Sequence, residues 1–303
     1  MRIKYPFDYS VMVEQTKLAQ INEQDAQREM RNFRRSIQDK YGYEIKLERA
    51  QAGVLPKTTT VWDQDPPVMC HTIRLGSPSQ EMMSSARIME PYVRGQALMK
   101  IEIECVAREA GVHKLYVMTR ESANDIRGLC EPWVQEEISK GKSEKELRKV
   151  VGSAVFGLSY SVNSYPTKML VDLELNRRFP ILRPAQFVRE NLWELYGSND
   201  PSKVMLPDPL TVPLRALHAA NRLFLDEDLF NGTTTHFAAL RGTTVGNLAE
   251  ELFKAAKTEY GSVSPGCHYA LMNRFAEITG FPNMIKWEDR PRHEYLAETA
   301  SFN

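Results

Sequence analysis

The sequence predicts an α+β protein whose first part, of about 180 residues, mixes strands with helices and whose second part is mostly helical. Three observations carry this prediction. Several short segments alternate apolar and polar residues, which is the period of a half-buried strand. Other segments repeat apolar residues at helical spacing and end at a glycine. Six prolines then lie within residues 177–213, and mostly helical patterns follow them.

The N-terminal elements begin with a strand and a helix. Ser10 can cap a helix of about 25 residues, whose apolar residues lie near helical spacing until Gly42 ends it. Strands are expected at residues 2–7, 43–48, 68–75 and 86–89. The last of these strands is expected to end before Pro91.

The middle of the chain continues the mixed pattern. A helix is expected at 95–110, where Gly111 ends it, and a buried strand at 113–119. A further helix spans about 122–151 with a break near Gly141. The residues after it favour a hairpin with a turn at Asn163-Ser-Tyr-Pro. Its two strands are expected at 154–162 and 168–175.

The last part divides into a connector and a helical region. The prolines of 177–213 surround one short helix at 185–196. Three helices follow: one marked by Leu214, Leu217 and Phe224, one at 245–260 with Thr244 as cap and Gly261 as stop, and one from Ser264 to Gly280. The expected domains are therefore 1–176, 177–213 and 214–303, the last with an extended tail.

The charge balance argues against binding to nucleic acid. Lysine plus arginine and aspartate plus glutamate both number 39, so the formal net charge is zero. Phosphate neutralisation usually needs a basic excess. Glu144 and Glu146 interrupt the densest basic segment, which favours a solvated helix face. That segment contains Lys140, Lys142, Lys145, Arg148 and Lys149.

The remaining composition favours a cytoplasmic protein. No run of about 18 apolar residues indicates a membrane span, and the N-terminal residues lack the apolar core of a secretory signal. The cysteines are far apart and have neither C-x-x-C pairing nor the spacing of zinc ligands. They are Cys70, Cys105, Cys130 and Cys267. We expect a reducing compartment and no bound metal.

One phrase of the sequence resembles a known family. Residues 86–100 read ARIMEPYVRGQALMK, and they are followed by AREAG at 107–111 and LYVMT at 115–119. With the predicted element order, residues 1–176 resemble the GNAT acyltransferase superfamily. The resemblance implies a mixed, mainly antiparallel sheet with flanking helices. It also implies a turn whose backbone N–H groups, with a helix N-terminus, hold the pyrophosphate of acyl-coenzyme A.

The resemblance also implies which residues bind the cofactor. They are Arg94, Gly95, Gln96, Ala97 and Asn124. Two positions depart from the family's signature, since Ala97 replaces its first glycine and Met99 stands where Gly or Ala is usual. A bulky side chain there would crowd a closely approaching phosphate. Glu131 also stands where the family often has a tyrosine acid.

In this family a substrate amine attacks the thioester directly, so a base must take the amine proton. Glu90 is the candidate base, and Tyr116 is a second catalytic candidate that lines the gap beside it. Each residue has an ordinary alternative: Glu90 as a surface carboxylate, Tyr116 as a core residue and Arg94 as a cation near a helix start.

Two other groups of residues suggest chemistry. Gly152-Ser-Ala-Val-Phe-Gly157 with Asp172 and Glu174 is similar to the glycine–serine signature and paired metal carboxylates of nucleotidyltransferases. Alternation in a strand equally explains both acids as a solvent face. Cys267 near a helix start could hold a thiolate of lowered pKa beside His268, or it could be a packed cysteine next to a surface histidine.

Two functions from different classes follow. The first is a GNAT-like N-acyltransferase that moves an acyl group from a coenzyme A thioester to an amine. The second is a non-catalytic assembly or structural protein of a large complex or virus particle. It would self-associate or bind protein partners through the helical C-terminal region. Trp287, Tyr295 and Phe302 are candidate anchors on the tail.

Overall fold

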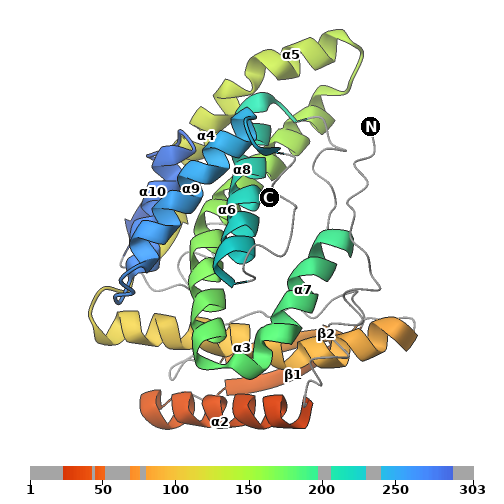
Figure 1. Ribbon diagram of the computed structural model, residues 1–303. Coiled ribbons are helices and arrows are strands. Elements are labelled where there is room, and N and C mark those ends of the chain that lie inside the picture. Colours follow the sequence, from red (N-terminus) through yellow and green to blue (C-terminus); the bar gives the residue numbers. More distant parts are fainter. Residues whose placement is uncertain are drawn as a thin grey trace. The chain divides into compact units, whose positions relative to one another are not determined.

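The computed structural model describes residues 23–42, 45–51, 69–75, 80–196, 206–229 and 240–288, and Figure 1 shows how their helices and strands follow one another. Several predictions fall outside these residues. They are the strand at 2–7, the cap at Ser10 and the tail anchors Tyr295 and Phe302.

Helices make up most of the described chain. The earlier ones are α2 (Glu23–Tyr41), α3 (Gln80–Glu109), α4 (Arg120–Leu129), α5 (Glu131–Ser139) and α6 (Glu144–Arg178). The later ones are the 3-10 helix η1 (Pro180–Leu182), α7 (Arg183–Tyr196), α8 (Asp208–Phe224), the π-helix η3 (Leu225–Leu229), α9 (Thr244–Tyr260) and α10 (Cys267–Ile278).

The described strands form two separate pairs. β1 (Ile45–Gln51) and β2 (Met69–Leu75) run parallel, whereas β3 (Leu115–Met118) and β4 (Ile285–Glu288) run antiparallel. Neither pair extends into a larger mixed sheet within the described residues. The predicted α+β class with a mainly antiparallel sheet is therefore wrong, and so is the GNAT-like fold. The described chain is predominantly helical.

The strand predicted at 86–89 is wrong because these residues belong to α3. Pro91 lies inside this helix, where it removes one backbone hydrogen bond. Buried side chains on the following turns, among them Tyr92, Leu98 and Ile101, offset that loss. Tertiary burial thus overrides the tendency of proline to end a helix.

The hairpin predicted at 154–162 and 168–175 is also wrong, since both segments lie in the single helix α6. β-branched and aromatic residues in these segments favour strands. The buried residues nevertheless recur at spacings of four and three, which is the period of a helix. They are Val151, Val155, Leu158 and Val162. Pro166 lies inside α6, and its carbonyl accepts a hydrogen bond of 2.5 Å from the Tyr260 hydroxyl.

Other elements confirm the predictions. The strands at 43–48, 68–75 and 113–119 are present as β1, β2 and β3, and the three C-terminal helices are α8, α9 and α10. Gly141 breaks the helix predicted at 122–151, with a φ of 88°, and Cys130 separates α4 from α5. The cap of α9 is Thr243 rather than Thr244, because its side chain accepts from the Gly246 N–H at 3.0 Å.

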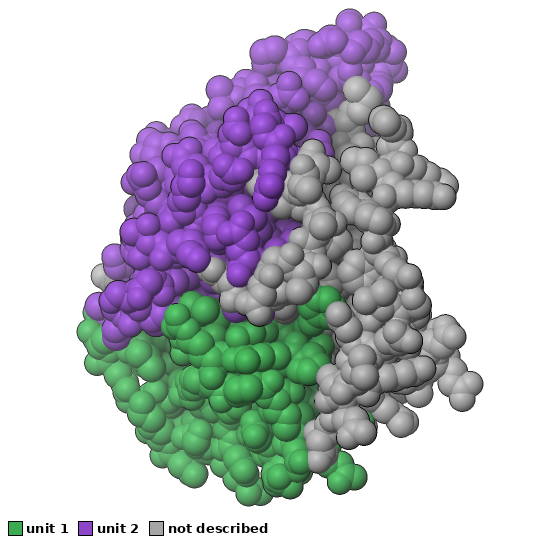
Figure 2. All heavy atoms as spheres, in the orientation of Figure 1, with its two compact units in different colours: residues 1–111, 171–197, 290–303 green, residues 112–170, 198–289 purple. Residues whose placement is uncertain are grey.

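The chain forms two compact units, which Figure 2 shows in different colours. Unit 1 contains residues 1–111, 171–197 and 290–303, and unit 2 contains residues 112–170 and 198–289. Each unit therefore combines segments that are distant in the sequence. Helix α6 contributes its residues 144–170 to unit 2 and its residues 171–178 to unit 1.

The core of unit 1 lies where α2, α3, the end of α6 and the start of α7 meet. The residues that α2 buries, Ala26, Met30, Phe33 and Ile37, follow one helix face. Gly95 on α3 lets the side chains of Met30 and Leu182 pack directly against the helix backbone. A Cβ atom there would lie 3.0 Å from the Met30 sulfur and 3.1 Å from a Leu182 methyl group.

The core of unit 2 is built from helices. Helix α9 packs against both α8 and α10, and Phe224 of α8 makes edge contacts with Phe253 and Tyr260 of α9. The side chain of Trp287 on β4 donates a hydrogen bond of 2.8 Å to Asn273 on α10. None of the helices in the described parts of the chain is both long enough and apolar enough to cross a membrane.

Candidate functional site

A cluster of polar side chains lies inside unit 1, where the helices α3, α6 and α7 meet. We call Tyr92, Gln96, Asp172 and Glu190 the Tyr92 cluster. The exposed fraction is 0% for Tyr92 and Asp172 and 6% for Glu190. Buried carboxyl groups carry a large desolvation cost unless they are hydrogen-bonded. Their partners therefore decide what this cluster can do.

The tyrosine hydroxyl lies at the centre of the cluster. It donates to Asp172 Oδ1 at 2.7 Å, lies 3.2 Å from Glu190 Oε1, and accepts from the Gln96 amide at 2.7 Å. The same amide donates to Asp172 Oδ1 at 2.9 Å. Because Tyr92 and Gln96 are one helical turn apart on α3, both reach the carboxylate that α6 supplies.

A second layer of amides surrounds the cluster. Gln186 on α7 donates to the backbone carbonyl of Asp172 at 3.3 Å and accepts from the Asn176 amide at 3.2 Å. Arg189 on α7 is also buried, with an exposed fraction of 9%. Its positive charge acts on Tyr92 and opposes the effect of the two carboxylates.

Burial raises the pKa of the Tyr92 hydroxyl well above its usual range, and the negative charges of Asp172 and Glu190 raise it further. The hydroxyl therefore stays protonated and acts as a donor. Because the exposed fractions of Tyr92 and Asp172 are both 0%, the cluster suits the fixing of three helices better than chemistry on a substrate.

The residues predicted for catalysis and for cofactor binding are divided between the two units. Glu90, Arg94, Gly95, Gln96 and Ala97 lie on α3 in unit 1. They lie well inside a helix that begins at Gln80, so their backbone N–H groups bond within the helix and do not form an anion-binding turn. Tyr116 on β3 and Asn124 on α4 belong to unit 2.

Several of these residues make contacts that bear on the roles predicted for them. The Glu90 carboxylate accepts a hydrogen bond of 2.8 Å from Arg94, so the candidate base is held in an ion pair with the candidate phosphate ligand. Gln96 is part of the Tyr92 cluster. Ala97 and Met99 are buried on α3. Asn124 is exposed and accepts from Arg127 at 3.2 Å.

The two acids of the nucleotidyltransferase-like pattern are also arranged differently from the prediction. Asp172 and Glu174 would share one face of a strand, but on α6 they point in different directions. Asp172 is fully buried, whereas Glu174 is partly exposed and pairs with Arg177 at 3.3 Å. Among the residues that the structure describes, no three His, Cys, Asp or Glu side chains are grouped to hold a metal ion.

Cys267 and His268 are both buried at the start of α10. Burial raises the pKa of the Cys267 thiol, which is the opposite of an activated thiolate. The alternative of a surface histidine is not met either, since the exposed fraction of His268 is 0%. Its ring lies 3.9 Å from that of Tyr269, measured between centroids.

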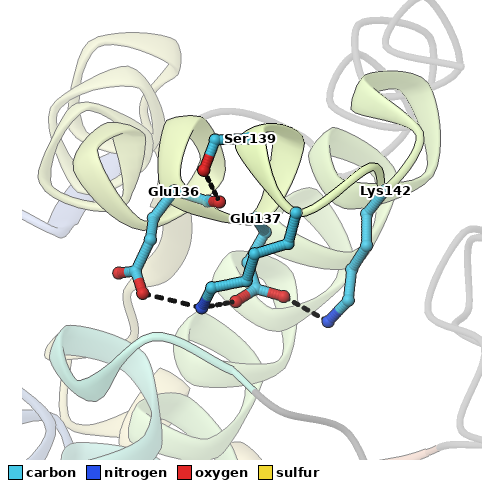
Figure 3. A network of polar contacts seen from close by, with 5 residues as sticks. Glu136, Glu137, Ser139 and Lys142 are labelled. Carbon is cyan, nitrogen blue, oxygen red and sulfur yellow. Dashed lines mark hydrogen bonds and ion pairs between the residues drawn. The ribbon is translucent and has the colours of Figure 1, made fainter.

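The basic segment at 140–149 is largely paired with acids, as Figure 3 shows for its first part. Lys140 donates to Glu136 at 2.6 Å and to Glu137 at 2.8 Å, and Lys142 pairs with the other oxygen of Glu137. Arg148 pairs with Glu131 at 2.9 Å and with Glu144 at 2.8 Å. These ion pairs place Lys140, Lys142 and Arg148 beside acidic neighbours on the helix surface.

Glu137 gives a pH-dependent prediction. Hydrogen bonds from Lys140 and Lys142 lower the pKa of its carboxyl, whose side chain is only 3% exposed. A group with a lowered pKa in the folded state stabilises fully above its unfolded pKa of about 4.3 and loses that effect as the pH falls further. We expect Glu137→Gln to lower the melting temperature at pH 7 and to have a smaller effect at pH 3. Circular dichroism melts at both pH values measure this. An equal effect at both would contradict the paired carboxylate, and Glu136→Gln, on an exposed side chain, is the control.

An exposed apolar surface lies on α6 in unit 2. Phe156 and Tyr160 are one turn apart, and their exposed fractions are 66% and 60%. Both lie opposite the buried stripe of the helix. The same side carries Lys149, Gly152, Ser153 and Gly157, which together with the two aromatic residues we call the α6 face. A Cβ atom on either glycine would meet no other atom within 4 Å.

The sequence did not identify the Tyr92 cluster or the α6 face, although a signal for each was present. Once the residues at 151, 155, 158 and 162 are taken as a helical stripe, Phe156 and Tyr160 fall on the opposite side. The same period places Asp172 in a buried position among apolar residues. The incorrect strand assignment hid both features.

Comparison with protein families, with curated proteins and with solved structures finds no match. The chain is therefore described by its structural class. It is a predominantly helical protein of two compact units, with a buried polar cluster in unit 1 and an exposed aromatic helix face in unit 2.

Proposed function

We propose that this chain is a non-catalytic assembly protein that associates with copies of itself through the α6 face. It would act in the cytoplasm as a structural component of a larger complex or particle. The observation that carries the proposal is the exposure of Phe156 and Tyr160 side by side on one helix. Single exposed apolar residues need no explanation, but an adjacent aromatic pair is typical of interface anchors.

The two glycines of the α6 face add support. Glycine inside a helix is less favourable than alanine by about 1 kcal/mol. The packing of the described chain does not require it at Gly152 or Gly157, since a Cβ atom at either position meets open space. A glycine beside an aromatic residue leaves a shallow groove next to a ridge, and such a groove lets a neighbouring helix approach closely.

The occupant that best fits this surface is a second copy of the chain. In a two-fold interface the same surface of both copies is in contact. That surface must therefore contain both projecting side chains and the space that receives them. The α6 face does so, because the exposed side chains of Phe156 and Tyr160 lie beside the small residues Ser153 and Gly157. Within the described residues, Cys105, Cys130 and Cys267 are buried and form no disulfide, which supports a reducing compartment for the assembly.

The acyltransferase expectation is not carried forward, because it depended on a resemblance whose fold the structure contradicts. The assembly proposal needs no catalytic group. It is consistent with a Tyr92 cluster that is closed to solvent and with a Glu90 that is bound in an ion pair.

Sedimentation velocity on the full chain tests the proposal. At micromolar concentrations we expect a dimer or larger species. The double variant Phe156→Ser/Tyr160→Ser should raise the dissociation constant about 30-fold or more, since two anchor residues each contribute on the order of 1–2 kcal/mol.

The matched control is Leu129→Ser, which removes another exposed apolar side chain, 56% accessible on α4, and should associate like the wild type. A wild-type chain that stays monomeric at these concentrations would refute self-association. An equal loss in the Leu129 variant would show that the α6 face is not the interface.

A further inference from the structure

Three arginines lie near the contact between α2 and α3 in unit 1, where the positive charges of Arg31 and Arg34 act on Arg94. Gly95 of α3 lies against Met30 of α2, so the residues next to them, Arg94 and Arg31, are brought to the same crossing. Arg34 is one helical turn after Arg31 on α2. We call Arg31, Arg34 and Arg94 the arginine cluster.

The hydrogen bonding of the arginine cluster is incomplete. Arg94 is 14% exposed, and its Nη2 donates a hydrogen bond to Glu90 at 2.8 Å. Within the described residues, the Nε–H groups of Arg34 and Arg94 are buried and have no hydrogen-bond partner. A guanidinium group presents five N–H donors, and buried donors are almost always satisfied in native proteins.

The charge is also unbalanced. The arginine cluster carries three positive charges, and within the described part of the chain the carboxylate that pairs with it is that of Glu90. Burial lowers the pKa of Arg94, and the positive charges of Arg31 and Arg34 lower it further against the pull of Glu90. By contrast, the neighbouring Arg28 has its own partner, Asp25, at 2.5 Å.

We propose that the arginine cluster is a binding site for a phosphate-type oxyanion, either free or as the phosphate group of a larger molecule. A dianion would balance the net charge of the three guanidinium groups and Glu90. Guanidinium forks match tetrahedral oxygens because they offer parallel N–H donors, which the unused Nε–H groups of Arg34 and Arg94 would complete. The site is independent of the assembly function, since it lies in unit 1 and the α6 face belongs to unit 2.

Isothermal titration calorimetry on the full chain tests the site with inorganic phosphate, in a buffer whose ionic strength is held constant with sodium chloride. We expect saturable binding. Arg31→Gln and Arg34→Gln should each weaken it about tenfold or more, which is the usual effect of losing one charge-assisted hydrogen bond. Arg31 is exposed, so its variant should fold normally even if Arg94→Gln does not.

Arg177→Gln is the charge-matched control, because Arg177 belongs to unit 1 but pairs with Glu174. It should bind phosphate like the wild type. A parallel titration with phenyl phosphate identifies the source. Tighter binding than inorganic phosphate supports a phosphorylated ligand, and weaker binding supports the free anion. Absence of saturable binding to both probes, or an equal loss in the Arg177 variant, would overturn the proposal.

Discussion

Asp172→Ala is expected to lower the free energy of unfolding of unit 1 by about 3–5 kcal/mol, because it removes one member of a buried, charged hydrogen-bond network. The Tyr92 hydroxyl and the Gln96 amide would both lose their acceptor Oδ1. Tyr92→Phe should cost less, about 1–3 kcal/mol, since it removes one hydroxyl and leaves the ring packed. Because the two side chains contact each other, the double variant should cost less than the sum of the single variants.

Hydrogen exchange measured by mass spectrometry is the suitable readout, since the chain has two units and a single unfolding midpoint need not describe both. Exchange should increase in α3, α7 and residues 171–178, while α9 and α10 of unit 2 serve as the internal control. A change below about 0.5 kcal/mol for Asp172→Ala would contradict the network, because that is the size of an ordinary surface substitution.

The raised pKa of Tyr92 predicts that the folded state loses stability at alkaline pH. The pKa of Tyr92 is raised in the folded state, so its contribution is fully present below the unfolded value of about 10 and is lost as the pH rises through the folded value.

Gly246→Ala is expected to destabilise the start of α9 by about 2–4 kcal/mol, the combined effect of overpacking and a lost cap. A Cβ atom at this position would lie 1.9 Å from the backbone oxygen of Leu240, which is far inside the contact distance. That oxygen also accepts the Thr243 hydroxyl at 2.7 Å, and the same hydroxyl accepts from the Gly246 N–H. Moving Leu240 away therefore breaks the cap of the helix.

Gly128→Ala is the control, and it is expected to stabilise the protein rather than destabilise it. Gly128 is in α4, and a Cβ atom there would meet nothing within 4 Å. Replacing a helical glycine by alanine should stabilise by up to about 1 kcal/mol. Thermal unfolding followed by circular dichroism compares the two variants. If Gly246→Ala were as stable as Gly128→Ala, the described contact with Leu240 would be wrong.

The local sequence pattern predicted an element correctly where spacing and end signals indicated the same structure. The helical spacing of Met30, Phe33 and Ile37 and the glycine stop at Gly42 predicted the described part of α2. The apolar pattern at 245–260 likewise predicted α9. In these segments periodicity, capping and burial agree.

Pattern failed where local propensity and tertiary packing disagree. Pro91 and Pro166 suggested breaks, and the β-branched residues of 154–175 suggested strands, yet these prolines lie inside α3 and α6. The strands predicted in these segments were part of the element order that, together with the phrase at 86–119, carried the GNAT resemblance. Long helices prevailed because each buries a continuous apolar face, which outweighs a single lost hydrogen bond.

The sequence by itself determined the helices of the C-terminal region, the presence of strands at about 43–48, 68–75 and 113–119, and the zero net charge. Only the tertiary structure decided that β3 pairs with β4 from the far end of the described chain, and that Tyr92, Asp172 and Glu190 meet. It also decided that Phe156 and Tyr160 face outward. The physical reason is that periodicity records which face of an element is apolar, whereas the partner of that face depends on long-range packing.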